Sequence, residues 1–466
     1  MIFQSSLLVV LRLHTTHKQM TQEKALALLK SGRNIFLTGS AGTGKTYVLN
    51  QFTQHLKDAN VDVAITASTG IAATHIKGST IHSWAGIGIK QLLTEKDLRN
   101  LKKKKYLREQ FDKVKVLIID EISMLHRDQL NSINQVLTYC KENNEAFGGV
   151  QIVLCGDFFQ LPPIGKYGER SSDKFSFMST AWQNANFNIC YLTKQFRQND
   201  NVLGDVLEEV RCGNVTQKSI DALKNAENTT FESGIEPTKL YTHNEDVDFI
   251  NNTHLADLPS KSRFFKAKTS GDKALITVLK NTVLTQNDMP LRIGAKVMFV
   301  KNNVEKGYIN GTLGEIIKFS SIGIPVVKTL DNETITASPE EWSIDDEKGN
   351  TLASYKQIPL RLAWAITVHK SQGMTLDAAE LDLGRTFERG QGYVALSRLR
   401  DIHRLRLLNF NSVSLMVDGL AMKADKRFQV LASELDESTS LEELNNESKA
   451  FIRASGGRVL TKIVHK

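Results

Sequence analysis

The chain has 466 residues, of which 41% are hydrophobic and 24% charged, which is the balance of a globular protein with length for two to four domains. Its four cysteines form no CxxC pair, which argues against structural zinc and a disulfide framework and favours a reducing compartment. The sequence has no apolar run long enough to span a membrane, and its net charge of +8 favours a polyanionic partner.

The N-terminal segment, residues 1–19, carries a short apolar run that resembles the apolar part of a signal peptide. No Lys or Arg precedes this run and no small-residue cleavage site follows it. Basic residues without acidic ones would also suit a weak organelle transit sequence. We expect residues 1–19 to be a disordered extension, or to lie upstream of the true start at Met20.

A helix is predicted to begin at Met20, with Thr21 as its cap and apolar residues at helical spacing. Gln22 lies on the first turn of this helix, shortly before the next strand. Its side-chain amide could be solvated, or it could recognise an adenine base through two hydrogen bonds. The residues alone leave both readings open.

Residues 35–46, IFLTGSAGTGKT, predict a short buried strand followed by a phosphate-binding P-loop. The glycines allow the backbone to turn so that successive N–H groups face an anion, and the dipole of the following helix adds positive potential. We expect Lys45 to contact the β- and γ-phosphates of ATP and the Thr46 hydroxyl to complete a Mg²⁺ site. The predicted nucleotide-binding residues are Gln22, Gly39, Ser40, Ala41, Gly42, Thr43, Gly44, Lys45 and Thr46.

Two polar segments follow the second predicted strand, residues 61–66. Thr69 and Gly70 lie in the first segment, where small hydroxyl residues and glycine suit phosphate contacts. His82 and Trp84 lie in the second and could stack on or bond to nucleotides, although a lone tryptophan is more often a core residue. Four consecutive lysines at 102–105 form either a solvated face or part of a nucleic-acid path.

Two further apolar strands end in polar residues. The strand at 114–119 leads to Asp120 and Glu121, which read as a Walker B element with Asp120 at Mg²⁺ and Glu121 polarising the attacking water. The strand at 150–155 leads to Phe158 and Gln160. Gln160 could sense the γ-phosphate, and Phe158 could face a base, with core packing as its alternative.

The strands up to residue 189 alternate with helices, as in a parallel sheet. Arg197 follows this sheet and is expected to begin a second domain and to reach the nucleotide as an arginine finger. Residues 200–285 carry helical patterns. A strand at 239–242 interrupts them, with His243 and Asn244 at its end. Short alternating strands and an Asn310–Gly311 hairpin turn then predict a small β-barrel insertion, and Arg398 is a second candidate finger.

Seven motifs, in chain order, resemble those of the PIF (petite integration frequency) DNA helicases, relatives of the RecD subunit in the 5′-to-3′ branch of superfamily one. The resemblance covers roughly residues 20–410 and rests on GSAGTGKT, TASTGIAA, IIDEISML, LCGDFFQLPPI, LTKQFRQ, LAWAITVHKSQGMTL and GYVALSRLR. It implies the catalytic residues Lys45, Glu121, Gln160, Arg197 and Arg398, with Gln22 reading adenine and Thr46 and Asp120 at Mg²⁺. It places Thr69, Gly70, His82, Thr367, His369, Lys370 and Ser371 in motifs that grip or lie beside single-stranded DNA. We also expect DNA contacts from Trp84, Phe158, His243 and Asn244.

The expected architecture is α/β, with two RecA-like P-loop domains built on parallel sheets. The first domain covers 20–190 with a small insertion at about 85–110, and the second covers 191–290 and 357–411. The β-barrel insertion covers 291–356, and residues 412–466 form a tail that is helical at most in part and disordered at its end.

The implied activity is that of an ATP-dependent DNA helicase that moves 5′ to 3′ on single-stranded DNA. Its expected partners are single-stranded DNA, DNA junctions and a single-stranded DNA-binding protein, and it is expected to act as a monomer or as a dimer on DNA. The eukaryotic members carry long N-terminal regions that this chain lacks, which favours the cytoplasm of a bacterial or phage-type host over a nucleus or mitochondrion. An RNA helicase and an ATP-gated clamp without strand separation remain as alternatives.

Overall fold

The computed structural model describes residues 20–76, 78–88, 90–166, 168–197, 200–231, 237–283, 285–301, 303–308, 312–329, 332–345, 351–376 and 378–460. The N-terminal extension expected at residues 1–19 and the hairpin turn expected at Asn310–Gly311 lie outside these residues.

The first domain is built on a six-stranded parallel sheet with the strand order β3-β2-β4-β5-β1-β6. The central strands are buried along their whole length, which explains why they are almost continuously apolar in the sequence. The strands are β1 (Ile35–Gly39), β2 (Val63–Ala67), β3 (Ser79–Thr80), β4 (Val116–Asp120), β5 (Gln151–Cys155) and β6 (Asn188–Leu192). Because all six strands run in parallel, the P-loop and the polar ends of β4 and β5 meet at one edge of the sheet.

The sheet separates two hydrophobic cores. Ile35 and Leu37 face the core shared with α2 (Gln22–Lys30) and α3 (Lys45–Asp58), whereas Phe36 between them faces the opposite core. The opposite core is covered mainly by α8 (Arg127–Lys141). The remaining helices of this domain are α4 (Gly70–His75), α5 (Ile81–Trp84), α6 (Glu95–Lys103), α7 (Lys105–Lys113), α9 (Ser171–Lys174) and α10 (Thr180–Asn184).

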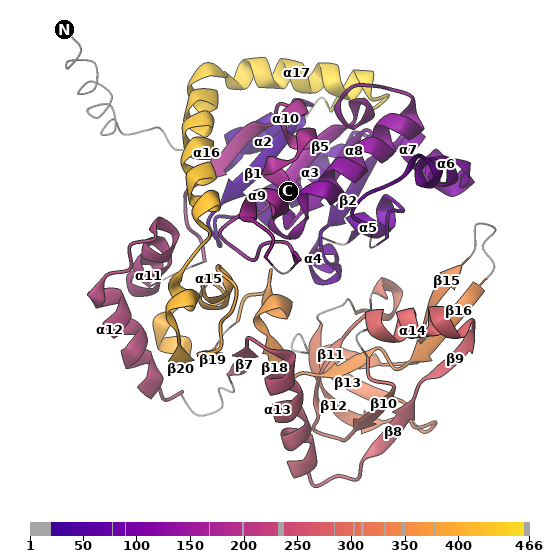
Figure 1. The fold of residues 1–466 in the computed structure, drawn as a ribbon, viewed down its shortest axis with the longest axis vertical. Helices are drawn as coiled ribbons and strands as arrows, with labels where there is room; N and C mark the ends of the chain where they lie inside the picture. The colour runs from indigo at the N-terminus through magenta and orange to yellow at the C-terminus, as the bar shows by residue number, and fades with distance from the viewer. Residues whose placement is uncertain are drawn as a thin grey trace.

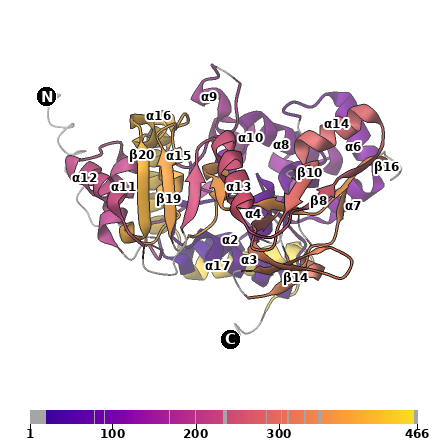
Figure 2. The same cartoon turned by 90° about the horizontal axis from the view of Figure 1, so that it is seen from below.

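A second parallel sheet, with the strand order β18-β7-β19-β20, forms the second domain. Its strands come from both sides of the insertion: β7 (Thr238–Tyr241) precedes it, and β18 (Ala365–Thr367), β19 (Ala379–Leu383) and β20 (Leu405–Phe410) follow it. The accompanying helices are α11 (Asn201–Cys212), α12 (Gln217–Asn225), α13 (Asn244–Asp257) and α15 (Gln391–Leu396). Figure 1 shows this domain below the first, and Figure 2, seen from below, shows β19 and β20 on the side opposite the insertion.

The insertion consists of antiparallel strands and differs from the expected small barrel in two ways. Its strands begin at Arg263, inside the stretch for which helical patterns are expected, so the boundary expected at 291 is too late. Among the described residues, the five-stranded order β14-β13-β12-β11-β17 has no pairing between its first and last strands, so closure into a barrel is not confirmed. The elements are β8 (Arg263–Lys266), β9 (Lys268–Gly271), α14 (Lys273–Thr282), β10 (Asp288–Leu291), β11 (Lys296–Phe299), β12 (Leu313–Phe319), β13 (Pro325–Thr329), β14 (Thr334–Thr336), β15 (Glu340–Asp345), β16 (Thr351–Gln357) and β17 (Leu360–Leu362).

The expectation of a tail over 412–466 is wrong for the described part of that segment. Residues Gly419–Ser438 form α16 and Leu441–Ala454 form α17, and both helices return to the first domain, where Figure 1 shows them framing it. Leu444 and Ile452 are buried in the core beneath α2 and α3. Arg33 pairs with Glu447 at 2.5 Å, and together these contacts make α17 part of the first domain.

Candidate nucleotide and DNA site

The P-loop connects β1 to α3 and is held from the side by α2. The side-chain amide of Gln22 donates a 3.1 Å hydrogen bond to the carbonyl oxygen of Thr43. Gly44 has a φ of 83°, and a Cβ at this position would lie 2.2 Å from the Gln22 amide nitrogen. The left-handed backbone favours a glycine here, and its missing side chain leaves room for the Gln22 amide. The structure places Gln22 beside the loop, as the resemblance implies.

The ammonium group of Lys45 lies over the loop itself. Its Nζ donates hydrogen bonds of 2.8 Å to the carbonyl oxygen of Gly39 and 2.9 Å to that of Ser40. Burial lowers the pKa of Lys45, because few water molecules stabilise its charge. A phosphate group in the loop would give this cation a charged partner in place of two neutral carbonyls.

Two carboxylates lie at the end of β4. Glu121 has a left-handed backbone with φ of 51°, and its carbonyl oxygen accepts a 2.7 Å hydrogen bond from the Ser68 hydroxyl. Burial raises the pKa of Glu121 to about 7, and the neighbouring charge of Asp120 acts in the same direction. Gln372, from the second domain, donates a 3.0 Å hydrogen bond to Glu121 Oε2. A carboxylate with a pKa near neutrality suits a base that takes a proton from water.

Two arginines approach from the other side of the cavity. Arg398 is only 2% exposed, and its guanidinium donates to the carbonyl oxygen of Val394 and the hydroxyl of Ser397. Burial, together with the positive charge of Arg197, lowers the pKa of Arg398 to about 10. The pKa of Arg197 is also lowered by burial. Arg398 is buried and Arg197 is half-buried, and two such guanidinium groups near each other are stabilised when an anion lies between them.

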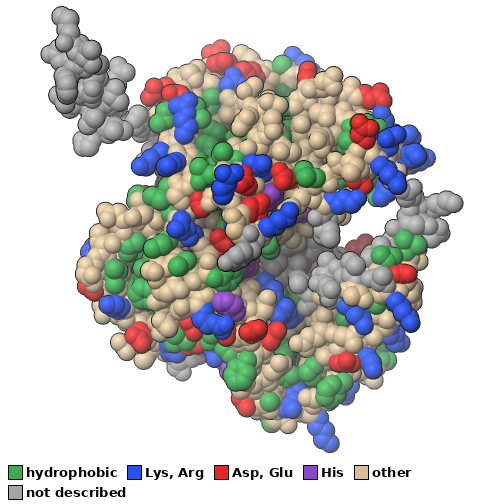
Figure 3. Space-filling view, in the orientation of Figure 1, with side chains coloured by type: hydrophobic (Ala, Val, Ile, Leu, Met, Phe, Trp, Pro, Cys, Tyr) green, Lys and Arg blue, Asp and Glu red, His purple; other side chains and the backbone are tan. Residues whose placement is uncertain are grey.

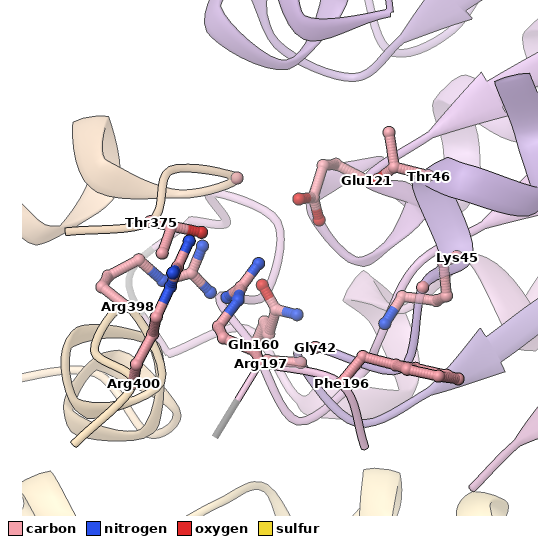
Figure 4. A pocket seen from close by; sticks show the side chains of 13 residues that line it. Gly42, Lys45, Thr46, Glu121, Gln160, Phe196, Arg197, Thr375, Arg398 and Arg400 are labelled. Atoms are coloured by element: carbon pink, nitrogen blue, oxygen red, sulfur yellow. The ribbon is translucent and has the colours of Figure 1, made fainter. Parts of the chain in front are cut away.

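These groups surround one cavity of about 390 Å³ between the two domains. Figure 4 shows Lys45, Thr46 and Glu121 facing Gln160, Arg197 and Arg398 across it. Gln160 is 5% exposed, and its Oε1 has no hydrogen-bond partner among the described residues. This amide oxygen can accept a hydrogen bond from a group bound in the cavity. The structure therefore brings all five predicted catalytic residues to one cavity.

The cavity is also lined by residues that were not predicted from the sequence, namely Phe196, Gly373, Thr375 and Arg400. Phe196 is 53% exposed and adjoins the predicted finger Arg197. An exposed aromatic beside an arginine finger suits stacking on a base, and its position in the chain could have identified it. Arg400 lies two residues after Arg398, so the same motif carries both.

The oxygen donors available for a metal are the Thr46 hydroxyl and the Asp120 carboxylate. Within the described ranges, no three His, Cys, Asp or Glu side chains are arranged to hold a metal ion. This donor set fits Mg²⁺, which binds such sites through one or two protein oxygens and takes its other ligands from phosphate and water.

Two of the predicted DNA contacts are wrong. Trp84 is 9% exposed and packs edge-on against Phe111, with their ring centroids 5.4 Å apart. Phe158 is 5% exposed and lies among aromatic rings, with Phe36 at 5.4 Å and Phe177 at 4.8 Å. Both rings fill the core behind the sheet and cannot reach a base without unfolding it.

Other predicted contacts lie closer to solvent on the first domain. The Thr69 hydroxyl accepts a 3.2 Å hydrogen bond from the Ala72 amide at the start of α4, and Gly70 is the first residue of that helix. His82 lies on α5 and is partly buried, and this burial lowers its pKa. Figure 3 shows Lys and Arg side chains gathered over α6 and α7, at the rim of the hollow between this domain and the insertion.

The predicted contacts on the second domain divide into supporting and accessible residues. Ser371 is fully buried and its hydroxyl donates to the carbonyl oxygen of Val368, and Thr367 is 4% exposed. The Ser371 hydroxyl holds the turn that carries His369 and Lys370, and the burial of Thr367 and Ser371 corrects the expectation that these two side chains contact DNA.

An aromatic ring that was not predicted from the sequence, Phe387, lies between two predicted histidines. Phe387 is 58% exposed, and its ring centroid is 5.1 Å from that of His243 and 6.3 Å from that of His369. Asn244 begins α13 beside His243 and is exposed. This group of rings forms an aromatic surface next to Lys370.

Comparisons with known proteins agree on one family. The family model for PIF1-like helicases matches residues 14–220. The ATP-dependent DNA helicase Pif1 of Psychrobacter sp. (strain PRwf-1) is 46% identical over 94% of this chain and 75% of that protein. The crystal structure of Pif1 helicase from Candida albicans has a TM-score of 0.81 at 35% identity, covering 87% of this chain and 98% of the other. Pif1 helicase from Bacteroides, in complex with ADP-AlF3 and single-stranded DNA, has a TM-score of 0.74 at 32% identity over 87% of this chain and 96% of the other.

Proposed function

The chain belongs to the family of PIF1-like helicases and is an ATP-dependent DNA helicase, and from this premise we propose that it moves 5′ to 3′ along single-stranded DNA and separates forked duplexes. The observation that carries the proposal is the cavity in which Lys45 and Glu121 of the first domain face Arg197 and Arg398. Such an enzyme serves DNA replication, repair or recombination.

ATP binds in this cavity with its phosphates in the P-loop, where Lys45 exchanges its two carbonyl partners for the β- and γ-phosphates. Glu121 orients the attacking water and accepts its proton, and the amide of Gln160 faces the γ-phosphate. Arg197 and Arg398 stabilise the charge that develops during phosphoryl transfer. Mg²⁺, held by Thr46 and Asp120, would neutralise charge on the β- and γ-phosphates.

Hydrolysis is coupled to movement because the cavity is assembled from both domains. Nucleotide binding draws the arginines toward the P-loop, and release of phosphate lets the domains separate again. The surface formed by Thr69, Gly70, His82, His243, Asn244, His369 and Lys370 holds single-stranded DNA, so that each cycle of closure and opening advances the strand. DNA that favours closure therefore stimulates hydrolysis.

The protein acts as a monomer in this proposal, and a second copy or a single-stranded DNA-binding protein joins it at forks. Within the described residues, no helix is both long and apolar enough to cross a lipid bilayer. The similarity to a bacterial relative favours a bacterial cytoplasm as the site of action.

The test is unwinding of two partial duplexes, one with a 5′ single-stranded tail and one with a 3′ tail, in the presence of ATP and Mg²⁺. Each is prepared as DNA and as RNA, with Lys45→Ala as the control. We expect unwinding of the 5′-tailed DNA only, and none by the control. Unwinding of the RNA duplexes, or hydrolysis without any strand separation, would contradict the proposal and indicate an RNA helicase or a clamp.

A further inference from the structure

A buried arginine outside the nucleotide cavity joins the two domains. Arg211, on α11, is 5% exposed and forms an ion pair of 2.7 Å with Asp157, which lies just beyond β5 and is 1% exposed. The same guanidinium donates hydrogen bonds to the hydroxyls of Tyr393 at 2.9 Å and Tyr191 at 3.0 Å. Its carbon lies 4.2 Å from the ring centre of Phe159, the residue before Gln160.

The hydroxyl of Tyr393 connects this network to the P-loop. It accepts from Arg211, donates to Asp157 Oδ2 at 3.2 Å and accepts a 3.4 Å hydrogen bond from the backbone amide of Ala41. Ala41 lies in the P-loop and lines the nucleotide cavity. One hydroxyl from the second domain therefore touches both the P-loop and the loop that carries Gln160.

The helix that carries Tyr393 also leads to the arginines. It is α15, Gln391–Leu396, and Ser397 and Arg398 follow it directly. At its other end, Gly390 has a φ of 86°, and a Cβ there would lie 2.7 Å from the carbonyl oxygen of Gln160. The start of α15 therefore packs against the backbone of Gln160, and Arg398 follows its end. Between them, the Tyr393 hydroxyl accepts a hydrogen bond from the P-loop.

We propose that Tyr393 is a positioning residue for ATP hydrolysis, whose hydroxyl aligns the helix bearing Arg398 with the P-loop and with Gln160. The proposal rests on the proposed function, since it concerns the same nucleotide cavity. Loss of the hydroxyl removes none of the side chains that touch the nucleotide, but it removes the hydrogen bonds that align the two halves of the cavity. The hydrolysis step is slowed by this change, whereas nucleotide binding to the P-loop is not.

The experiment compares Tyr393→Phe with Tyr191→Phe. The Tyr191 hydroxyl, on β6, also accepts from Arg211 and donates to Asp425 of α16 at 3.0 Å, but among the described residues its hydrogen bonds reach neither the P-loop nor α15. Both substitutions keep the aromatic ring and remove one hydroxyl that accepts a hydrogen bond from Arg211. A purely structural role for the network predicts similar effects of the two changes.

The readouts are kcat and KM for ATP with saturating single-stranded DNA, the affinity for a fluorescent single-stranded oligonucleotide without nucleotide, and Tm. We expect Tyr393→Phe to lower kcat at least tenfold with KM for ATP changed less than threefold and DNA affinity unchanged, and Tyr191→Phe to keep kcat within twofold. Equal loss of kcat in both variants, or no loss in Tyr393→Phe, would overturn the proposal.

A second variant guards against misfolding of Tyr393→Phe. Asp157→Asn keeps the shape of the side chain at the other end of the Tyr393 hydrogen bond, and is expected to lower kcat in the same way. A normal kcat in Asp157→Asn would also overturn the proposal. Failure of the proposed function is distinguishable, because the unaltered protein would then lack DNA-stimulated hydrolysis altogether.

Discussion

Arg197 donates a 3.0 Å hydrogen bond from Nη1 to the carbonyl oxygen of Ser397, the residue directly before Arg398. The two candidate fingers are therefore linked through the backbone, although they lie about two hundred residues apart in the chain. Because burial and mutual repulsion lower the pKa of Arg398, the pair is poised for an anion to enter between them. We infer that both arginines engage the γ-phosphate in one step.

Arg197→Ala should therefore remove more than one charge from the cavity. The variant loses its own guanidinium and releases the backbone that holds Arg398. We expect kcat for ATP hydrolysis on single-stranded DNA to fall by about 10³-fold or more, as for other arginine fingers, with nucleotide binding retained. The measurement is steady-state hydrolysis together with binding of a fluorescent ATP analogue.

The control for this prediction is Arg99→Ala. The Arg99 side chain is 63% exposed and pairs only loosely with Glu95 at 3.5 Å on the surface of α6. Its removal should leave kcat unchanged. Full hydrolysis by Arg197→Ala on single-stranded DNA would exclude a finger role for this residue.

Leu444 on α17 offers a test of the C-terminal helices as part of the first domain. It is fully buried in the core beneath α2, whereas Leu441 on the same helix is 42% exposed. Leu444→Ala should lower the free energy of unfolding of this domain by about 2–5 kcal/mol, the usual range for a buried leucine. Leu441→Ala should change it by no more than about 0.5 kcal/mol, as for an exposed site. Urea unfolding curves measure both, and equal effects would show that α17 does not support the core.

The residues that could be predicted from the sequence are those whose chemistry depends on local spacing. The P-loop and the pair Asp120 and Glu121 follow buried apolar strands, and parallel strands bring their ends to one edge of a sheet. Local patterns therefore carry the information for Lys45, Thr46 and Glu121, and the structure places these residues together.

The features that could not be predicted depend on contacts between distant segments. Helix α17 is rich in acidic and polar residues, so its apolar stripe is narrow, and only contact with α2 shows that Leu444 and Ile452 are core residues. An aromatic side chain can pack in a core or stack on a base, and only the contact with Phe111 shows that Trp84 is a core residue. The start of the insertion at Arg263 could not be predicted from the sequence, because β8 is short and largely exposed and so shows no clear apolar pattern.

Lys370 gives a prediction for pH dependence. Burial lowers its pKa to about 8, with Arg361 acting in the same direction and Asp248 opposing it. The ammonium is therefore charged below pH 8 and becomes neutral as the pH rises through that value. If it contacts a DNA phosphate, affinity for single-stranded DNA should fall up to about tenfold between pH 7 and pH 9, since protonation must accompany binding at high pH.

Fluorescence anisotropy with a labelled oligonucleotide at constant ionic strength measures this dependence. Lys370→Arg should bind with little change between pH 7 and pH 9, because a guanidinium stays charged over that range. Lys370→Ala should bind more weakly at pH 7 and reduce the slope of log affinity against log salt by about 0.7, the value for one phosphate contact on a single strand. A pH dependence that persists in Lys370→Ala would assign the titration to another group.

Phe387 and Trp84 allow an exposed aromatic side chain to be compared with one that fills the core. Phe387→Ala should weaken binding of single-stranded DNA by about 1–3 kcal/mol, the usual value of one stacked base, because its exposed ring lies between His243 and His369. Trp84→Phe keeps a ring against Phe111 and should leave DNA affinity unchanged while lowering Tm. Anisotropy titrations and thermal unfolding of both variants provide the comparison. Weaker DNA binding by Trp84→Phe at a temperature where it is fully folded would show that the indole, despite its burial, becomes accessible to a base when the strand binds.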